Sequence, residues 1–142
     1  MTHPDQPTRD RQALTILRWA LAAIIFIHGV YRALAGGVVP FGGWLEEQGL
    51  PFGLGIATLI TAVEIIGTPI LAWGKLQRPL ALWYACQLVG GIIMVHAPEG
   101  WFTVGGGRNG AEFATILVVG FLLTAWVAPP IRGPSAGTTS PP

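Results

Sequence analysis

The sequence predicts an all-α membrane protein, a four-helix transmembrane bundle with both termini in the cytoplasm. Of its 142 residues, 51% are hydrophobic and only 11% are charged, whereas a soluble domain carries about 25% charge. The mean hydropathy is +0.56. A chain of this length cannot bury so much apolar surface within itself, so these figures exclude a soluble globular enzyme and a disordered chain. A lipid bilayer therefore has to cover the apolar surface that the chain cannot bury.

Net charge and cysteine content exclude further classes of protein. The net charge of +1 provides no basic stripe for phosphates, which argues against nucleic-acid binding. The single cysteine, Cys86, excludes an internal disulfide and a CxxC redox pair.

Four apolar segments meet the length of about 20 residues that a spanning helix needs. They cover residues 13–35, 52–73, 79–96 and 110–128. None alternates like the strand of a membrane barrel, so helices are expected. Residues 1–12 are expected to form a disordered cytoplasmic arm and the Pro/Gly/Ser/Thr-rich residues 129–142 a disordered cytoplasmic tail.

The distribution of lysine and arginine predicts the orientation, because cytoplasmic loops carry the excess of these residues. The opposite face holds only Arg32 and Arg108. The six remaining cations share the side that contains both termini: Arg9, Arg11, Arg18, Lys75, Arg78 and Arg132.

Two segments allow more than one interpretation. The first apolar run, with Ala33-Leu34-Ala35, imitates a signal peptide, but Tyr31 and Arg32 stand where a cleavage site needs small neutral residues. We therefore expect an uncleaved span. Residues 44–48, in the outward loop, indicate either a short amphipathic helix lying on the bilayer or a docking patch.

Ionisable residues persist inside these spans, although a charge at a helix centre costs on the order of 2.5–3.5 kcal/mol on insertion scales. With the predicted orientation, those of all four spans lie at mid-depth or in the outward half. We expect a hydrated pocket there, with ligand-binding or proton-handling residues His28, Tyr31, Arg32, Glu64, His96, Arg108, Asn109 and Glu112.

Local spacing supports this grouping. His28, Tyr31 and Arg32 stand at i, i+3 and i+4, which places them on one helical face. Gly29 and Gly67 permit close helix approach. A kink is expected near Glu64 because Pro69 removes a backbone hydrogen bond.

Several chemistries are compatible with two histidines and two glutamates in a helical bundle. A di-metal site needs Glu-x-x-His motifs, which are absent here, so we expect no metal. Bis-histidine haem is disfavoured because His28 should lie deeper than His96. A quinone head group or another small polar ligand fits best, while Arg32 paired with Glu64 or Glu112 could instead be a structural ion pair.

At these residues the chain resembles the DoxX family of small four-helix membrane proteins. The segments HGVYRAL, GLPFGLGIATLITAVEIIGTPILAWG and GGGRNGAEFATILVVG carry the resemblance, which extends over about residues 13–128. Arg32 stands where a lysine is commoner in the family, which keeps the charge but changes the donor geometry. The matching positions are His28, Gly29, Arg32, Glu64, Gly67, His96, Gly110 and Glu112.

The resemblance implies a multi-pass protein of the bacterial inner membrane. Some members resemble the membrane subunit of a thiosulfate:quinone oxidoreductase, and others associate with superoxide dismutase and sulfurtransferase. We therefore expect a subunit of a redox complex, not catalytic by itself, that anchors a protein partner and binds a quinone-type or other small ligand.

Two alternatives remain open. One is a structural or assembly module whose polar cluster only locks helix packing. The other is a small-solute carrier, which would be a homo-oligomer because four short helices enclose little volume.

Overall fold

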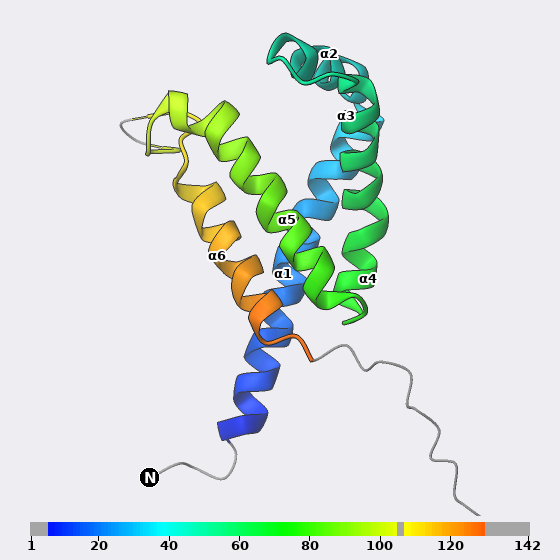
Figure 1. Ribbon diagram of the computed structural model, residues 1–142. Coiled ribbons are helices and arrows are strands. Elements are labelled where there is room, and N and C mark those ends of the chain that lie inside the picture. Colours follow the sequence, from blue (N-terminus) through cyan, green and yellow to red (C-terminus); the bar gives the residue numbers. More distant parts are fainter. Residues whose placement is uncertain (1–5, 105–106, 130–142) are drawn as a thin grey trace, which may run out of the picture.

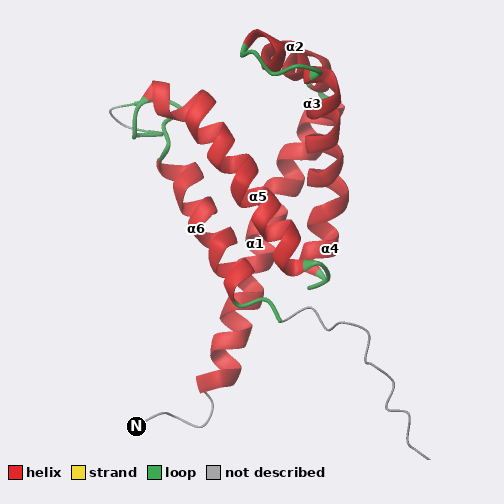
Figure 2. Ribbon diagram, viewed as in Figure 1, coloured by secondary structure: helices red, strands yellow, loops and turns green. Residues whose placement is uncertain are grey.

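A computed structural model describes residues 6–104 and 107–129 of the chain, and these ranges contain helices and loops without a strand (Figure 2). The all-helical prediction is thus confirmed. The elements are α1 (Gln6–Leu34), α2 (Val38–Glu47), α3 (Gly53–Ala62), the π-helical turn η1 (Val63–Gly67), α4 (Thr68–Ala72), α5 (Gln77–Gly91), a second π-helical turn η2 (Ile92–His96), the 3₁₀ turn η3 (Ala97–Glu99) and α6 (Glu112–Trp126).

Helix α1 begins earlier than expected. It spans 29 residues, so residues 6–12 continue the helix where a disordered arm was expected. Pro7 suits the first turn of a helix, and the following TRDRQAL contains no glycine or further proline to interrupt it. The rest of the predicted arm and the tail after Pro129 lie outside the described residues.

Three helical segments are long and apolar enough to cross a membrane. They are Pro7–Leu34, Gly53–Ala72 (α3, η1 and α4) and Gln77–Glu99 (α5, η2 and η3). The last two agree closely with the spans expected at residues 52–73 and 79–96.

The fourth apolar helix, α6, is shorter than the segment 110–128 predicted for it. It contains 15 residues, about 22 Å at the usual helical rise. The preceding loop explains its late start: the backbone N–H groups of Gly110, Ala111 and Glu112 donate to carbonyls of Phe102, Gly100 and Trp101 respectively. These bonds hold residues 110 and 111 in the loop.

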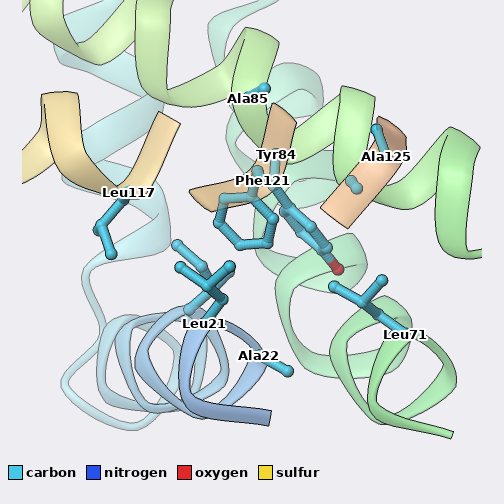
Figure 3. Packing of buried hydrophobic residues seen from close by; sticks show 10 residues of the cluster. Leu21, Ala22, Leu71, Tyr84, Ala85, Leu117, Phe121 and Ala125 are labelled. Carbon is cyan, nitrogen blue, oxygen red and sulfur yellow. The ribbon is translucent and has the colours of Figure 1, made fainter. Parts of the chain in front are cut away.

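The apolar core joins α1, α4, α5 and α6. Tyr84 of α5 and Phe121 of α6 are fully buried with their ring centroids 5.2 Å apart, and Leu21 and Leu71 pack beside them (Figure 3). Beyond this core, α5 and α6 diverge from α1 and α3 toward the end that carries α2, while α1 begins at the opposite end (Figure 1). Large apolar side chains such as Leu34 remain exposed on the outside, as a lipid-facing surface requires.

Helix α2 lies against the beginning of α3. A Cβ atom on Gly42 would lie 2.6 Å from the Cα atom of Leu54, so the two backbones touch. Leu45 is buried, whereas Glu46 and Glu47 are exposed. Residues 44–47 therefore belong to a helix with buried and exposed positions, and its place on the bilayer or in a docking patch stays a prediction.

Candidate functional site

A buried ion pair lies between α1 and η1. Arg32 Nη1 is 2.7 Å from Glu64 Oε2, and Glu64 is only 1% exposed. The same Nη1 donates to the Thr61 hydroxyl at 3.1 Å, and Nη2 lies 3.4 Å from Glu64 Oε1. The forked guanidinium therefore contacts both carboxylate oxygens, as this group is shaped to do.

Arg32 also links the ion pair to α2. Its Cζ atom lies 4.8 Å from the ring centroid of Phe41, within the range of a cation–π contact. The guanidinium is thus held between a carboxylate from η1 and an aromatic ring from α2.

Glu64 lies in a π-helical turn, in which Pro69 leaves the Glu64 carbonyl without a backbone donor. A π turn pairs each carbonyl with the N–H five residues later, and for Glu64 that residue is Pro69, which has no N–H. The Thr68 hydroxyl donates to the Glu64 carbonyl instead. Likewise, the Tyr84 hydroxyl donates to the Val63 carbonyl at 2.8 Å. The irregularity predicted near Glu64 is therefore a π turn in which side-chain hydroxyls donate to the carbonyls of Val63 and Glu64.

Gln87 of α5 completes the environment of the carboxylate. Its amide nitrogen Nε2 donates to Glu64 Oε1. Because a carboxylate only accepts, this contact fixes which end of the amide faces Glu64. The other end, Oε1, is buried and has no hydrogen-bond partner among the described residues.

Gly29 lets α1 approach Glu64. A Cβ atom at this position would lie 2.6 Å from Glu64 Cβ and 3.0 Å from Glu64 Oε2. Any side chain here would push the helices apart, as expected for a small residue at a membrane helix interface.

A cavity of about 760 Å³ opens beside this network, between the two diverging helix pairs of Figure 1. Leu59 and Leu88 contribute to its apolar wall, together with Trp44 and Trp83. Of the residues predicted for the site, His28, Arg32, Glu64, His96 and Asn109 line it. Helices α1, α2, α3, α5 and α6 all contribute lining residues.

His96 is held by the loop before α6. Its Nδ1 lies 2.8 Å from the carbonyl oxygen of Asn109. Asn109 has a left-handed backbone, with φ at 63°, a conformation that asparagine tolerates better than most residues. The contact with His96 is therefore made by the backbone of Asn109 and not by its side chain.

Three predicted site residues lie outside the cavity lining. Tyr31 is 73% exposed, because successive residues of a helix lie about 100° apart and Tyr31 therefore points away from the face on which Arg32 lies. Arg108 is exposed in the loop. The Glu112 carboxylate accepts a hydrogen bond from the Thr103 backbone N–H at 2.9 Å, which ties it to the loop instead of to Arg32.

Thr61, Tyr84 and Gln87 were not among the predicted site residues, although they belong to this network. The Gln87 amide lies inside an apolar span, and such a polar group could have indicated the site. A search restricted to ionisable residues does not find it. The described residues contain no group of three or more His, Cys, Asp or Glu side chains that could hold a metal ion.

The fold and this network define a helical membrane protein with a buried, charged contact between its helices. A family model, DoxX, matches residues 13–97. The chain belongs to the DoxX family, and the match covers Arg32, Glu64 and Gln87. No curated protein and no solved structure shows significant similarity to it.

Proposed function

We propose that this protein is a subunit of a redox-associated complex in the bacterial inner membrane and binds a quinone-type ligand between its helices. The single observation that carries the proposal is a cavity with large apolar walls and a few fixed polar groups, the composition expected of a small-molecule site. A partner protein, anchored by this subunit, would supply the electrons. The same partner would complete the enzyme.

The size of the cavity suits such a ligand. A volume of about 760 Å³ lies within the range of roughly 300–1,000 Å³ that is common for ligand pockets. Trp44 and Trp83 provide flat aromatic surfaces for a ring, and the aliphatic residues can accommodate the beginning of an isoprenoid tail. Arg32, Glu64 and Gln87 provide polar contacts at one wall.

The geometry of Arg32 and Glu64 favours a second candidate, a structural or assembly module. Each of these residues neutralises the charge of the other, and Thr61 and Gln87 add further hydrogen bonds. A buried pair of this kind can fix helix register without binding anything. The carrier alternative has no comparable observation in its favour.

Tryptophan fluorescence separates the two candidates. The protein in lipid nanodiscs is titrated with decylubiquinone, whose ring quenches nearby indoles, and empty nanodiscs correct for partition into lipid. Quinone binding predicts saturable quenching that is lost in the double variant Trp44→Phe/Trp83→Phe.

The matched control is Trp73→Phe/Trp126→Phe, which removes two exposed indoles outside the cavity lining and should keep the saturable quenching. Quenching that is linear with quinone content in every variant would favour the structural module.

A further inference from the structure

We infer that the cavity prefers a ligand that donates a hydrogen bond, so that a quinol binds more tightly than the corresponding quinone. This inference rests on the proposed function and names the redox state that the site favours. The observation behind it is the side-chain carbonyl oxygen of Gln87, which has no hydrogen-bond partner in residues 6–104 and 107–129.

The direction of the Gln87 amide is fixed by chemistry. Both Glu64 oxygens accept hydrogen bonds, from Arg32 and from Gln87 Nε2. If the amide were reversed, its carbonyl would face a carboxylate oxygen and two acceptors would meet. Within the described part of the chain, Gln87 Oε1 is therefore the group left without a donor.

An unpaired acceptor in this position is costly. A buried polar atom that lacks its hydrogen bond costs about 1–3 kcal/mol. Gln87 itself is only partly buried and lines the cavity. The terminal torsion of glutamine is soft, so we expect the amide of this cavity-lining residue to turn Oε1 toward a bound donor.

The donor that is needed cannot come from the neighbouring cation. The guanidinium of Arg32 is directed at Glu64 and Thr61. A phenolic hydroxyl on the ligand can supply the missing hydrogen, whereas the carbonyl oxygen of a quinone would meet Gln87 Oε1 as a second acceptor.

His96, which also lines the cavity, likewise presents a hydrogen-bond acceptor to it. The Asn109 carbonyl only accepts, so the hydrogen of a neutral His96 ring is on Nδ1 and Nε2 is left as an acceptor. Nine residues separate Gln87 from His96, about 13 Å along a helix. One ring therefore cannot reach both, and the head group belongs at Gln87, beside the ion pair.

The test compares three forms of one ligand on the wild-type protein in nanodiscs by isothermal titration calorimetry. They are decylubiquinol, decylubiquinone and the dimethyl ether of decylubiquinol, which keeps the ring but lacks both donors. We expect decylubiquinol to bind at least tenfold more tightly than either of the others. For a two-electron couple, a tenfold preference for the reduced form raises the midpoint potential of the bound ligand by about 30 mV.

The variant Gln87→Leu removes the acceptor, and the three affinities should then agree within about threefold. If this variant fails to fold, the dimethyl ether still decides the question on the wild-type protein. Equal or tighter binding of the quinone to the wild type would overturn the inference while leaving the proposed function intact. If none of the three ligands binds, the proposed function itself fails.

Discussion

At the scale of single residues, charge in an apolar segment was the useful signal. It identified Arg32 and Glu64 before any geometry was known, because such side chains are costly in lipid. The sequence could not decide between Glu64 and Glu112 as the partner of Arg32, since helix packing and loop contacts determine the distances. The structure pairs Arg32 with Glu64 at 2.7 Å and ties Glu112 to Thr103.

The first prediction concerns the energy of this ion pair. Removing one partner of a buried pair typically costs about 3–5 kcal/mol, because the other charge is left uncompensated, whereas replacing both by apolar residues is often tolerated. We expect Glu64→Leu to lower the free energy of unfolding by about 3 kcal/mol. The double variant Arg32→Met/Glu64→Leu should regain most of that loss.

Unfolding in mixed detergent micelles, titrated with sodium dodecyl sulfate, measures both values. Arg108→Gln is the control, because Arg108 is exposed and should change the stability by less than about 0.5 kcal/mol. Additive losses in the double variant would show that the two side chains do not depend on each other.

At the scale of helices, the contact between α1 and η1 depends on a glycine and on an irregular turn. The presence of a helix over residues 53–72 could be predicted from its apolar length. A kink was predicted from Pro69, whereas the structure has a π-helical turn whose carbonyls accept hydrogen bonds from the side chains of Thr68 and of Tyr84 in α5. Contacts of this kind between separate helices are not encoded in local sequence patterns.

The second prediction tests the close approach at Gly29. Gly29→Ala places a Cβ atom 2.6 Å from Glu64 Cβ and should destabilise the protein by about 1–3 kcal/mol, the usual cost of overpacking. Gly90→Ala is the matched control, because a Cβ atom there has no neighbour within 4 Å among the described residues and alanine favours a helix. We expect Gly90→Ala to be neutral or slightly stabilising in the same detergent titration; equal losses for both variants would refute the close contact.

The third prediction tests the Thr68 hydroxyl, which donates a hydrogen bond to a carbonyl of the π turn. Thr68→Val keeps the shape of the side chain but leaves the Glu64 carbonyl without its donor, so a loss of about 1–3 kcal/mol in the free energy of unfolding is expected. Thr58→Val removes a similar hydroxyl, bonded to the Leu54 carbonyl but exposed, and should cost less than about 0.5 kcal/mol. If thermal unfolding places both variants at the same midpoint, the hydroxyl of Thr68 does not support the turn.

At the scale of the whole molecule, composition and apolar length were sufficient to predict an all-helical membrane protein. Boundaries were less predictable: α1 begins at Gln6, and α6 is shortened by bonds from residues 110–112 to the loop before it. The cavity was predicted from the shared depth of the polar residues, and five of the eight candidates line it. The other three lie outside its lining, which the sequence does not reveal because loop conformation and helix rotation decide which way they face.

The fourth prediction concerns orientation in the membrane, for which the bias of lysine and arginine is the only argument. Green fluorescent protein fused after residue 142 should be fluorescent, because it folds in the cytoplasm. Alkaline phosphatase inserted at Gly49, in the turn between α2 and α3, should be active because that turn is expected to face the periplasm. The reverse pattern would place the cavity at the cytoplasmic side.

The presence of a ligand site inside the bundle is tested most directly by photolabelling. The protein in nanodiscs is irradiated with an azido-ubiquinone analogue, and the modified residues are mapped by mass spectrometry, with excess decylubiquinol as competitor. We expect competitor-sensitive labels on α2 around Trp44 and on α5 between Trp83 and Gln87. Labels confined to lipid-facing residues such as Trp126, and unchanged by the competitor, would contradict a binding site between the helices.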